Sequence, residues 1–174
     1  MIYELYIELK GIEPRIWRKI QVDANIKLDE LHHVIQIAMG WTNSHLYSFK
    51  IGNEEFSLKE YEVDTEYQDS MKHRLMEFSE EEFVYLYDFG DYWEHQIQIV
   101  QKLKGKEPYK ALCVDGRGKC PPEDVGGIPG FMEFLKAMKD DNHPERDSYI
   151  EWYGSAFDPR ELRIPRINYL LSLI

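Results

Sequence analysis

Hydrophobic and polar positions alternate over two stretches at the start of the chain. In residues 3–10, Tyr3, Leu5, Ile7 and Leu9 occupy every second position, and a period of two returns in residues 16–22. A period of two is typical of a half-buried strand. Gly and Pro punctuate the residues between the two stretches, so we predict an antiparallel hairpin.

A period close to four replaces the alternation in residues 28–39. Leu28, Leu31, Val34 and Ile35 recur at the spacing of one helical face. Gly40 follows, and glycine adopts the left-handed conformation that commonly ends a helix. The pattern therefore predicts one strong helix that stops at Gly40.

The rest of the chain returns to strands and then to a helix. We expect a strand over 45–51, a polar and acidic excursion over 54–82 with one helical turn, and a hairpin of strands 83–87 and 93–100. Residues 104–130 read as a loop and 131–138 as a helix, while the state of 149–157 and 164–174 stays open.

This order predicts an α+β fold, in which one main helix packs on a mixed or antiparallel sheet. We expect a β-grasp-like core over about residues 1–101. A Gly/Pro loop and a helical C-terminal segment follow over about 102–174. The length of 174 residues suits a single domain.

The charge is strongly negative and unevenly distributed. The chain has 21 basic and 32 acidic residues, a net charge of −11, and residues 61–100 alone contribute −9. Phosphate binding needs a basic surface, so nucleic acid is not the expected partner. The sequence lacks a membrane-spanning apolar run and a signal-peptide pattern, and it has two cysteines, so we expect a cytoplasmic protein.

The most informative motif spans residues 87–95, where two carboxylates sit on a turn and a histidine follows. Asp88 and Asp91 on this turn, with His95 on the next strand and His45 on an earlier one, are candidate ligands of a divalent metal. The alternative is structural, because an Asp at a turn caps its own backbone and a strand histidine often packs in the core.

A second motif is the loop over residues 118–130, which holds three prolines and four glycines. Such a composition encodes one backbone shape, and shaped loops often carry function. Cys120, Glu123 and Asp124 are its candidate binding residues, and the two acids would join the Asp88 turn if the loop folds back. The alternative is a loop that only covers a sheet edge.

Four further candidates are aromatic or basic. Trp17 and Arg18 are adjacent on the second strand, His32 lies on the main helix, and Trp41 follows its end. Trp93 of the 87–95 motif is a fifth. Aromatic residues more often pack in a core than bind a ligand, so packing is the competing interpretation of all of these.

The chain resembles the plasmid-encoded pRiA-type ORF-three-like family. The matching stretches are residues 11–18, 31–41, 45–46, 85–95, 120–127 and 157–159, of which the 85–95 and 120–127 motifs are the most specific. The family's label implies a link to mobile elements and a transposon resolvase. The residues argue against a serine recombinase, because the first serine is Ser44 and the chain has no basic arm.

Two hypotheses of different classes remain. The first is a binding or interaction module for an unknown protein or small molecule, because no assembled nucleotide-binding or hydrolase motif is present. The alternative is a metal-dependent, hydrolase-like enzyme that uses Asp88, Asp91, His95, Glu123 and Asp124. It predicts that at least three ligands converge on one ion at about 2.0–2.6 Å.

Overall fold

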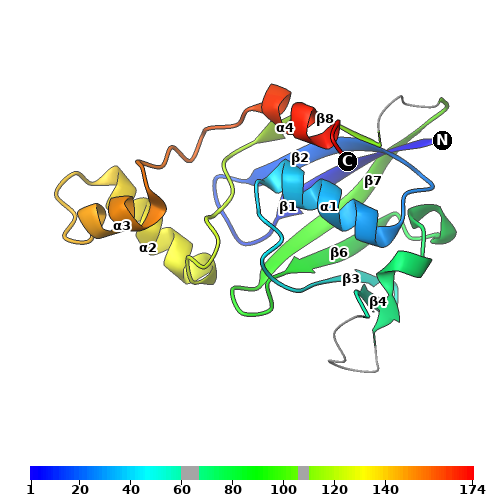
Figure 1. Cartoon of the computed structure of the whole chain (residues 1–174), viewed down its shortest axis with the longest axis horizontal. Helices are drawn as coiled ribbons and strands as arrows, with labels where there is room; N and C mark the ends of the chain where they lie inside the picture. The colour runs from blue at the N-terminus through cyan, green and yellow to red at the C-terminus, as the bar shows by residue number, and fades with distance from the viewer. Residues whose placement is uncertain (60–66, 106–109) are drawn as a thin grey trace.

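The computed structural model describes residues 1–59, 67–105 and 110–174. Its elements run in the order β1 (Ile2–Leu9), β2 (Ile16–Asp23), α1 (Leu28–Met39), β3 (Tyr47–Ile51), β4 (Glu54–Ser57), β5 (Gln68–Asp69), the 3-10 turns η1 (Ser70–Lys72) and η2 (Leu75–Glu77), β6 (Glu82–Tyr87), β7 (Trp93–Leu103), β8 (Ala111–Arg117), α2 (Gly127–Lys139), α3 (Arg146–Tyr153) and α4 (Ile164–Leu171). The fold class is α+β, as the pattern predicts (Figure 1).

One mixed sheet organises the molecule. Its strand order is β5-β4-β3-β6-β7-β1-β2-β8, and every neighbouring pair is antiparallel except β4 with β5. β1 lies between β7 and β2 and is antiparallel to both of them. The β-grasp-like part of the prediction is not confirmed.

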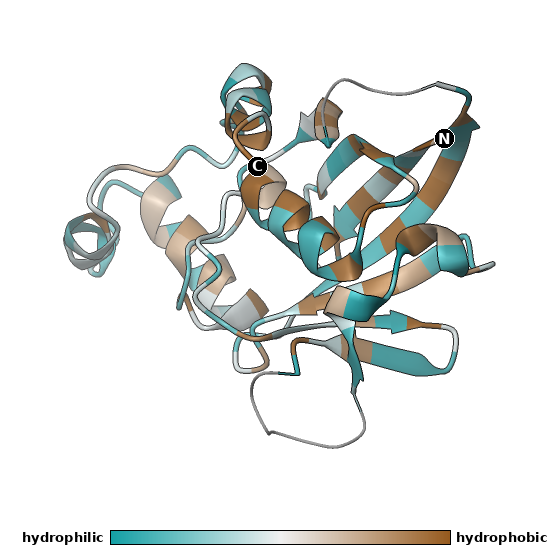
Figure 2. Ribbon diagram, turned by 45° about the vertical axis from the view of Figure 1, so that its right-hand side comes forward, coloured by the Kyte–Doolittle hydropathy of each residue, from teal (hydrophilic) through white to brown (hydrophobic). Residues whose placement is uncertain are grey.

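Helix α1 crosses one face of the sheet (Figure 1). Its buried side includes Leu28, Leu31, Val34 and Ile35, each fully covered, and Gly40 ends it with a φ of 98°. Apolar and polar positions alternate in colour along α1 and the central strands in Figure 2, as expected of elements that bury one side. The predicted helix and its stop are confirmed.

Helix α4 covers the edge strand β8. The Asn168 side chain accepts from the Cys113 backbone N–H at 2.7 Å and donates to the Cys113 carbonyl at 2.9 Å. The side-chain amide thus makes the two hydrogen bonds that a neighbouring strand would make with Cys113. These bonds cover part of an otherwise unpaired sheet edge. Helices α2 and α3 lie together at one end of the molecule (Figure 1).

Two predicted loops contain regular structure. The loop expected over 104–130 is wrong in part, because β8 joins the sheet there and α2 begins at Gly127. Residues 106–109 of that stretch lie outside the described residues, as do residues 60–66 of the expected excursion. The rest of the excursion holds β4, β5 and two 3-10 turns. No helix within the described ranges is long and apolar enough to span a membrane.

Candidate functional site

Three segments meet at one end of the central strands β6 and β7: the loop after α1, the turn between β6 and β7, and the loop before α2. His45 Nε2 lies 2.9 Å from Asp124 Oδ1, 3.6 Å from Asp88 Oδ2 and 3.9 Å from Glu123 Oε2. These four residues are called the His45 cluster below. The 118–130 loop therefore folds back against the 87–95 turn, which is the condition under which Glu123 and Asp124 would join Asp88.

His45, Asp88 and Asp124 offer ligand atoms that all lie within 4.8 Å of one another. Across the part of the chain that the structure describes, they are the only group of three or more His, Cys, Asp or Glu residues with this property. Atoms bound about 2.1 Å from one ion lie about 3–4 Å apart, and the 2.9 Å and 3.6 Å distances from His45 Nε2 to Asp124 and Asp88 are close to that range.

The turn itself orients Asp88. Its Oδ1 atom accepts from the N–H groups of Gly90 at 2.9 Å and of Asp91 at 3.3 Å, as an Asp at a turn commonly does. The Asp88 residue is only 6% exposed, and its other oxygen, Oδ2, faces His45. One oxygen is therefore fixed by the backbone, and the other is left for the cluster.

Glu123 is held in the same way. Its Oε1 atom accepts from the Thr42 N–H at 2.9 Å and from the Tyr87 hydroxyl at 3.0 Å, while the buried Oε2 atom has no hydrogen bond within the described residues. Burial raises the pKa of Tyr87 well above its usual value, which keeps the hydroxyl protonated as a donor. The Ser44 N–H in turn donates to this hydroxyl at 2.9 Å.

Asp91 fastens the two loops together. Its Oδ2 atom accepts from the Gly126 N–H at 3.0 Å, and the next residue, Gly127, has a φ of 66°. A Cβ at Gly127 would lie 2.8 Å from the Asp91 carbonyl oxygen, so only glycine allows this approach. Asp91 anchors the loop and does not enter the His45 cluster.

Backbone strain concentrates around the cluster. Four non-glycine residues among those described have a left-handed φ: Asn43 (54°), Asp88 (57°), Tyr92 (61°) and Asp124 (59°). Asn and Asp tolerate this region, whereas a tyrosine rarely adopts it. All four lie in the three segments that meet here, and strained backbone tends to collect at functional sites.

His95 lies apart from the cluster, in the core of the sheet. The residue is fully buried on β7, its Nδ1 atom is 3.2 Å from the Tyr85 carbonyl oxygen, and its ring meets Trp41 edge-on at 5.2 Å. Burial lowers the pKa of His95 to about 4, and the Arg18 charge adds to this. Of the four metal candidates, the structure brings together His45 and Asp88, and it adds Asp124.

The candidate tryptophans pack. Trp93 is fully buried, and Trp41 is 6% exposed and donates from Nε1 to the Pro121 carbonyl at 3.0 Å. Trp41 thus attaches the 118–130 loop to the core. Trp17 is half-buried against the Tyr6 ring, with 5.4 Å between ring centroids.

Arg18 is buried and held almost entirely by backbone carbonyls. Nε donates to Ala38 at 2.8 Å, Nη1 to Trp17 at 2.7 Å and to Arg117 at 2.9 Å, and Nη2 to Gly118 at 2.8 Å. Nη2 also lies 3.9 Å from Cys120 Sγ. We call this arrangement the Arg18 hub. It joins β2, the end of α1, β8 and the start of the 118–130 loop.

Cys120 and His32 are both held in neutral form by burial. Burial raises the pKa of the Cys120 thiol to about 11 and lowers that of His32 to about 3. His32 is stacked on Tyr47 and hydrogen-bonded to the Tyr85 hydroxyl at 2.8 Å and to Asn43 Oδ1 at 2.7 Å. It therefore positions the loop that carries His45 and does not face the cluster itself.

The residues that orient the cluster, Thr42, Ser44 and Tyr87, escape the sequence-based list. Ser44 acts through its backbone N–H, which carries no side-chain signature, while Thr42 donates to Glu123 Oε1 from its backbone N–H at 2.9 Å and from its hydroxyl at 3.2 Å. Tyr87 offered one weak signal. It ends a predicted strand and shares the buried face with Tyr85, beside the Asp88 turn.

Comparison with known proteins places the chain in a family. Residues 1–165 match the model of the plasmid pRiA4b ORF-3-like proteins, so the chain belongs to that family. The uncharacterized protein y4hQ of Sinorhizobium fredii is 36% identical over 173 residues, which cover 96% of this chain and 89% of that protein.

A solved structure shows the same fold. The protein of unknown function MM3350 from Methanosarcina mazei Go1 matches with a TM-score of 0.84 and 31% identity, over 94% of this chain and 96% of that one. Neither relative's name assigns an activity, so these names support neither the hydrolase-like alternative nor a resolvase.

Proposed function

We propose that this member of the pRiA4b ORF-3-like family is a binding module built around a divalent cation. His45, Asp88 and Asp124 hold the ion, and Glu123 is placed as a fourth ligand. The observation that carries the proposal is the convergence of their donor atoms within one small volume. No other described group of metal-ligating side chains has this geometry.

The atoms without a hydrogen bond favour a cation site over an ordinary cluster of ion pairs as the interpretation of these residues. His45 Nε2 is buried and makes no hydrogen bond, since Asp124 Oδ1 lies off the direction of a ring N–H despite the 2.9 Å approach. Glu123 Oε2 is likewise buried and unbonded within the described residues. Buried polar atoms in native proteins are nearly always paired. Five side-chain atoms among the described residues are buried and unpaired, and these two lie 3.9 Å from each other, so one missing partner could serve both.

The surrounding hydrogen bonds resemble the outer shell of a metal site. The backbone of the turn fixes Asp88, while Thr42 and Tyr87 fix Glu123, in each case through one carboxylate oxygen. Such contacts orient the ligands before the ion arrives. One imidazole nitrogen with several carboxylate oxygens suits Zn²⁺ or Mn²⁺.

The binding surface of the module lies on the same turn. Phe89 and Tyr92 follow the cluster's Asp88 in the turn and are 40% and 56% exposed. Exposed aromatic side chains beside an ion give a partner both apolar contact area and a charged anchor. This arrangement supports recognition of a protein or small-molecule partner.

The test is calorimetric titration with ZnCl₂ and with MnCl₂. The full-length protein is purified without chelator and is then stripped of bound metal before the titration. We expect one saturable site, with an affinity reduced at least tenfold in His45→Ala and in Asp124→Asn. The matched control is His33→Ala, which removes an exposed histidine outside the cluster and should leave the affinity unchanged.

Two outcomes would overturn the proposal. One is the absence of saturable binding by the unmodified protein. The other is wild-type affinity in both cluster variants while circular dichroism shows them folded. Either result would make the cluster an ion-pair network that joins three loops.

A further inference from the structure

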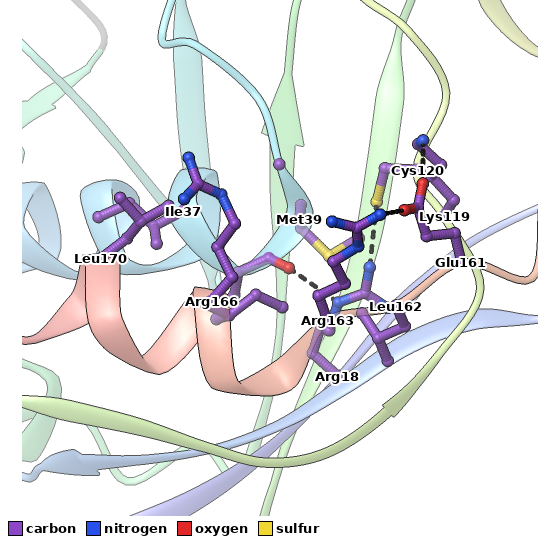
Figure 3. A pocket seen from close by; sticks show the side chains of 13 residues that line it. Arg18, Ile37, Met39, Lys119, Cys120, Glu161, Leu162, Arg163, Arg166 and Leu170 are labelled. Atoms are coloured by element: carbon purple, nitrogen blue, oxygen red, sulfur yellow. Dashed lines mark hydrogen bonds and ion pairs between the residues drawn. The ribbon is translucent and has the colours of Figure 1, made fainter. Parts of the chain in front are cut away.

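A pocket lies away from the His45 cluster, between the end of α1, the start of the 118–130 loop and α4 (Figure 3). Its volume is about 370 Å³, which falls within the range of small-molecule sites. The side chains of Arg166, on α4, and of Arg163, the residue just before α4, line it in Figure 3. Nothing in the proposed cation site uses this pocket.

The charge of the pocket is opposite to that of the protein. Four basic residues line it, Arg18, Lys119, Arg163 and Arg166, with Glu161 as the one acid. Glu161 is shared, because it pairs with Lys119 at 2.5 Å and with Arg163 at 2.6 Å. A local positive region on a chain of net charge −11 concentrates anions where the remaining surface repels them.

Two of these cations have no carboxylate partner. Arg166 is exposed and forms no ion pair within the described ranges. Arg18 is 1% exposed, and its hydrogen-bond partners among the described residues are four carbonyl oxygens and one sulfur, none of which carries a formal negative charge. Its charge is therefore buried and not neutralised, and it adds to the potential at the floor of the pocket.

The remaining walls are apolar. They include Ile37, Met39, Leu162 and Leu170, which form an apolar surface beside the arginines. Arginine recognises carboxylates and phosphates through its planar fork, and an apolar wall binds a hydrocarbon or aromatic body. A molecule that uses both the arginines and the apolar wall must therefore carry an acidic group and an apolar body.

We propose that this pocket binds a small amphipathic organic anion. Its acidic group pairs with Arg166 and Arg163, and its apolar body lies against the side chains from the end of α1 and from α4. The inference is independent of the cation site, because it concerns other residues and the opposite charge.

The test uses a fluorescent pair of probes on the full-length protein. 8-Anilinonaphthalene-1-sulfonate is an amphipathic anion, and N-phenyl-1-naphthylamine has the same rings without the acidic group. We expect the sulfonate to bind at one site, with a Kd raised at least fivefold in Arg166→Gln and further in Arg163→Gln/Arg166→Gln. The neutral amine should bind these variants and the wild type alike.

Lys50→Gln is the matched control, because it removes one exposed positive charge on β3, far from the residues that line the pocket. It should leave sulfonate binding unchanged. Arg166→Gln is expected to fold normally, since Arg166 is exposed and has no ion pair to lose within the described residues. Wild-type sulfonate affinity in both arginine variants, or an equal loss for the neutral amine, would overturn the proposal.

Discussion

The Arg18 hub and the His45 cluster are both polar, but they differ in how completely their hydrogen bonds are made. In the hub, every donor group of the guanidinium has a partner, and four of the five partners are backbone carbonyls. In the cluster, His45 Nε2 and Glu123 Oε2 are buried without one. The hub is complete within the chain, whereas the cluster leaves atoms for something else.

This difference separates a structural role from a binding role. A saturated buried network stabilises and specifies one arrangement of the chain, while an incomplete one costs free energy unless a ligand completes it. The strained backbone follows the same division, because the left-handed Asp88, Tyr92 and Asp124 surround the cluster. Removing hub groups should therefore cost stability, and removing cluster groups should cost binding.

The largest effect is expected from Arg18→Met. The substitution keeps an apolar chain of similar length but leaves the carbonyls of Ala38, Arg117 and Gly118 without their donor. Unpaired buried acceptors make the expected loss about 3–5 kcal/mol in the free energy of unfolding. Urea denaturation measures it.

The control for that variant is Arg15→Met. The Arg15 side chain is 62% exposed, and its ion pairs at 3.7 Å and 3.9 Å are long. Exposed pairs contribute little, so we expect a change below about 0.5 kcal/mol. A loss below about 1 kcal/mol in Arg18→Met would break the comparison, because the hub would then not be structural.

A smaller effect is expected from Gly127→Ala, which tests how the loop is fastened to the turn. Both Gly127 and Gly154 have a positive φ, but a Cβ would meet the Asp91 carbonyl at 2.8 Å only at Gly127, while Gly154 faces open space. We expect a loss of about 2–3 kcal/mol for Gly127→Ala and about 1 kcal/mol for Gly154→Ala. Thermal unfolding checks the difference.

Cation titration of the same two variants sharpens the comparison. Displacement of the loop moves Asp124, so Gly127→Ala should also weaken binding, whereas Gly154→Ala should not. Equal stability losses in the two variants would show that the close approach to Asp91 is not what holds the loop.

The smallest effect concerns His95, which is buried in the core outside the His45 cluster. Burial lowers the pKa of His95 to about 4 from an unfolded value near 6.5, so the unfolded chain takes up a proton first as the pH falls. Stability is fully present above about pH 6.5 and is lost between there and about pH 4. From pH 7 to pH 5, this histidine contributes a loss of roughly 2 kcal/mol.

His95→Gln measures that contribution. The variant should lose roughly 2 kcal/mol less than the wild type between pH 7 and pH 5, while His32 still contributes in the same direction in both proteins. Between pH 7 and pH 8 the two stability curves should run parallel. Parallel curves down to pH 5 would show that His95 is not held neutral in the folded state.

Local sequence patterns predicted the elements that bury one face. The alternation of β1 and β2, the helical spacing of α1 and the stop at Gly40 all appear in the structure. Strand β8 was missed because its residues, ALCVDGR, bury only Ala111 and Cys113. The start of α2 was missed because Gly127 and Pro129 disfavour a helix interior, although proline fits a first turn.

The candidate site was predicted as residue types and not as an arrangement. All four residues of the cluster were named from the sequence: Asp88, Glu123, Asp124 and His45. His95 was also named, and it packs in the core. Histidine carries the same letter in both roles, and only burial distinguishes them. The pocket residues Arg163 and Arg166 were not named, because two exposed arginines outside any motif carry no sequence signal.

The sequence by itself determined the elements with a clear hydrophobic period, such as β1, β2 and α1, because hydrophobic period and turn residues act over a few neighbours. The sequence also determined that most of the negative net charge lies in residues 61–100. Only the tertiary structure decided that His45 meets Asp124 and that Arg18 lies under the α4 pocket. Those contacts join residues far apart in the chain, and they depend on strand order and loop docking, which no local pattern encodes.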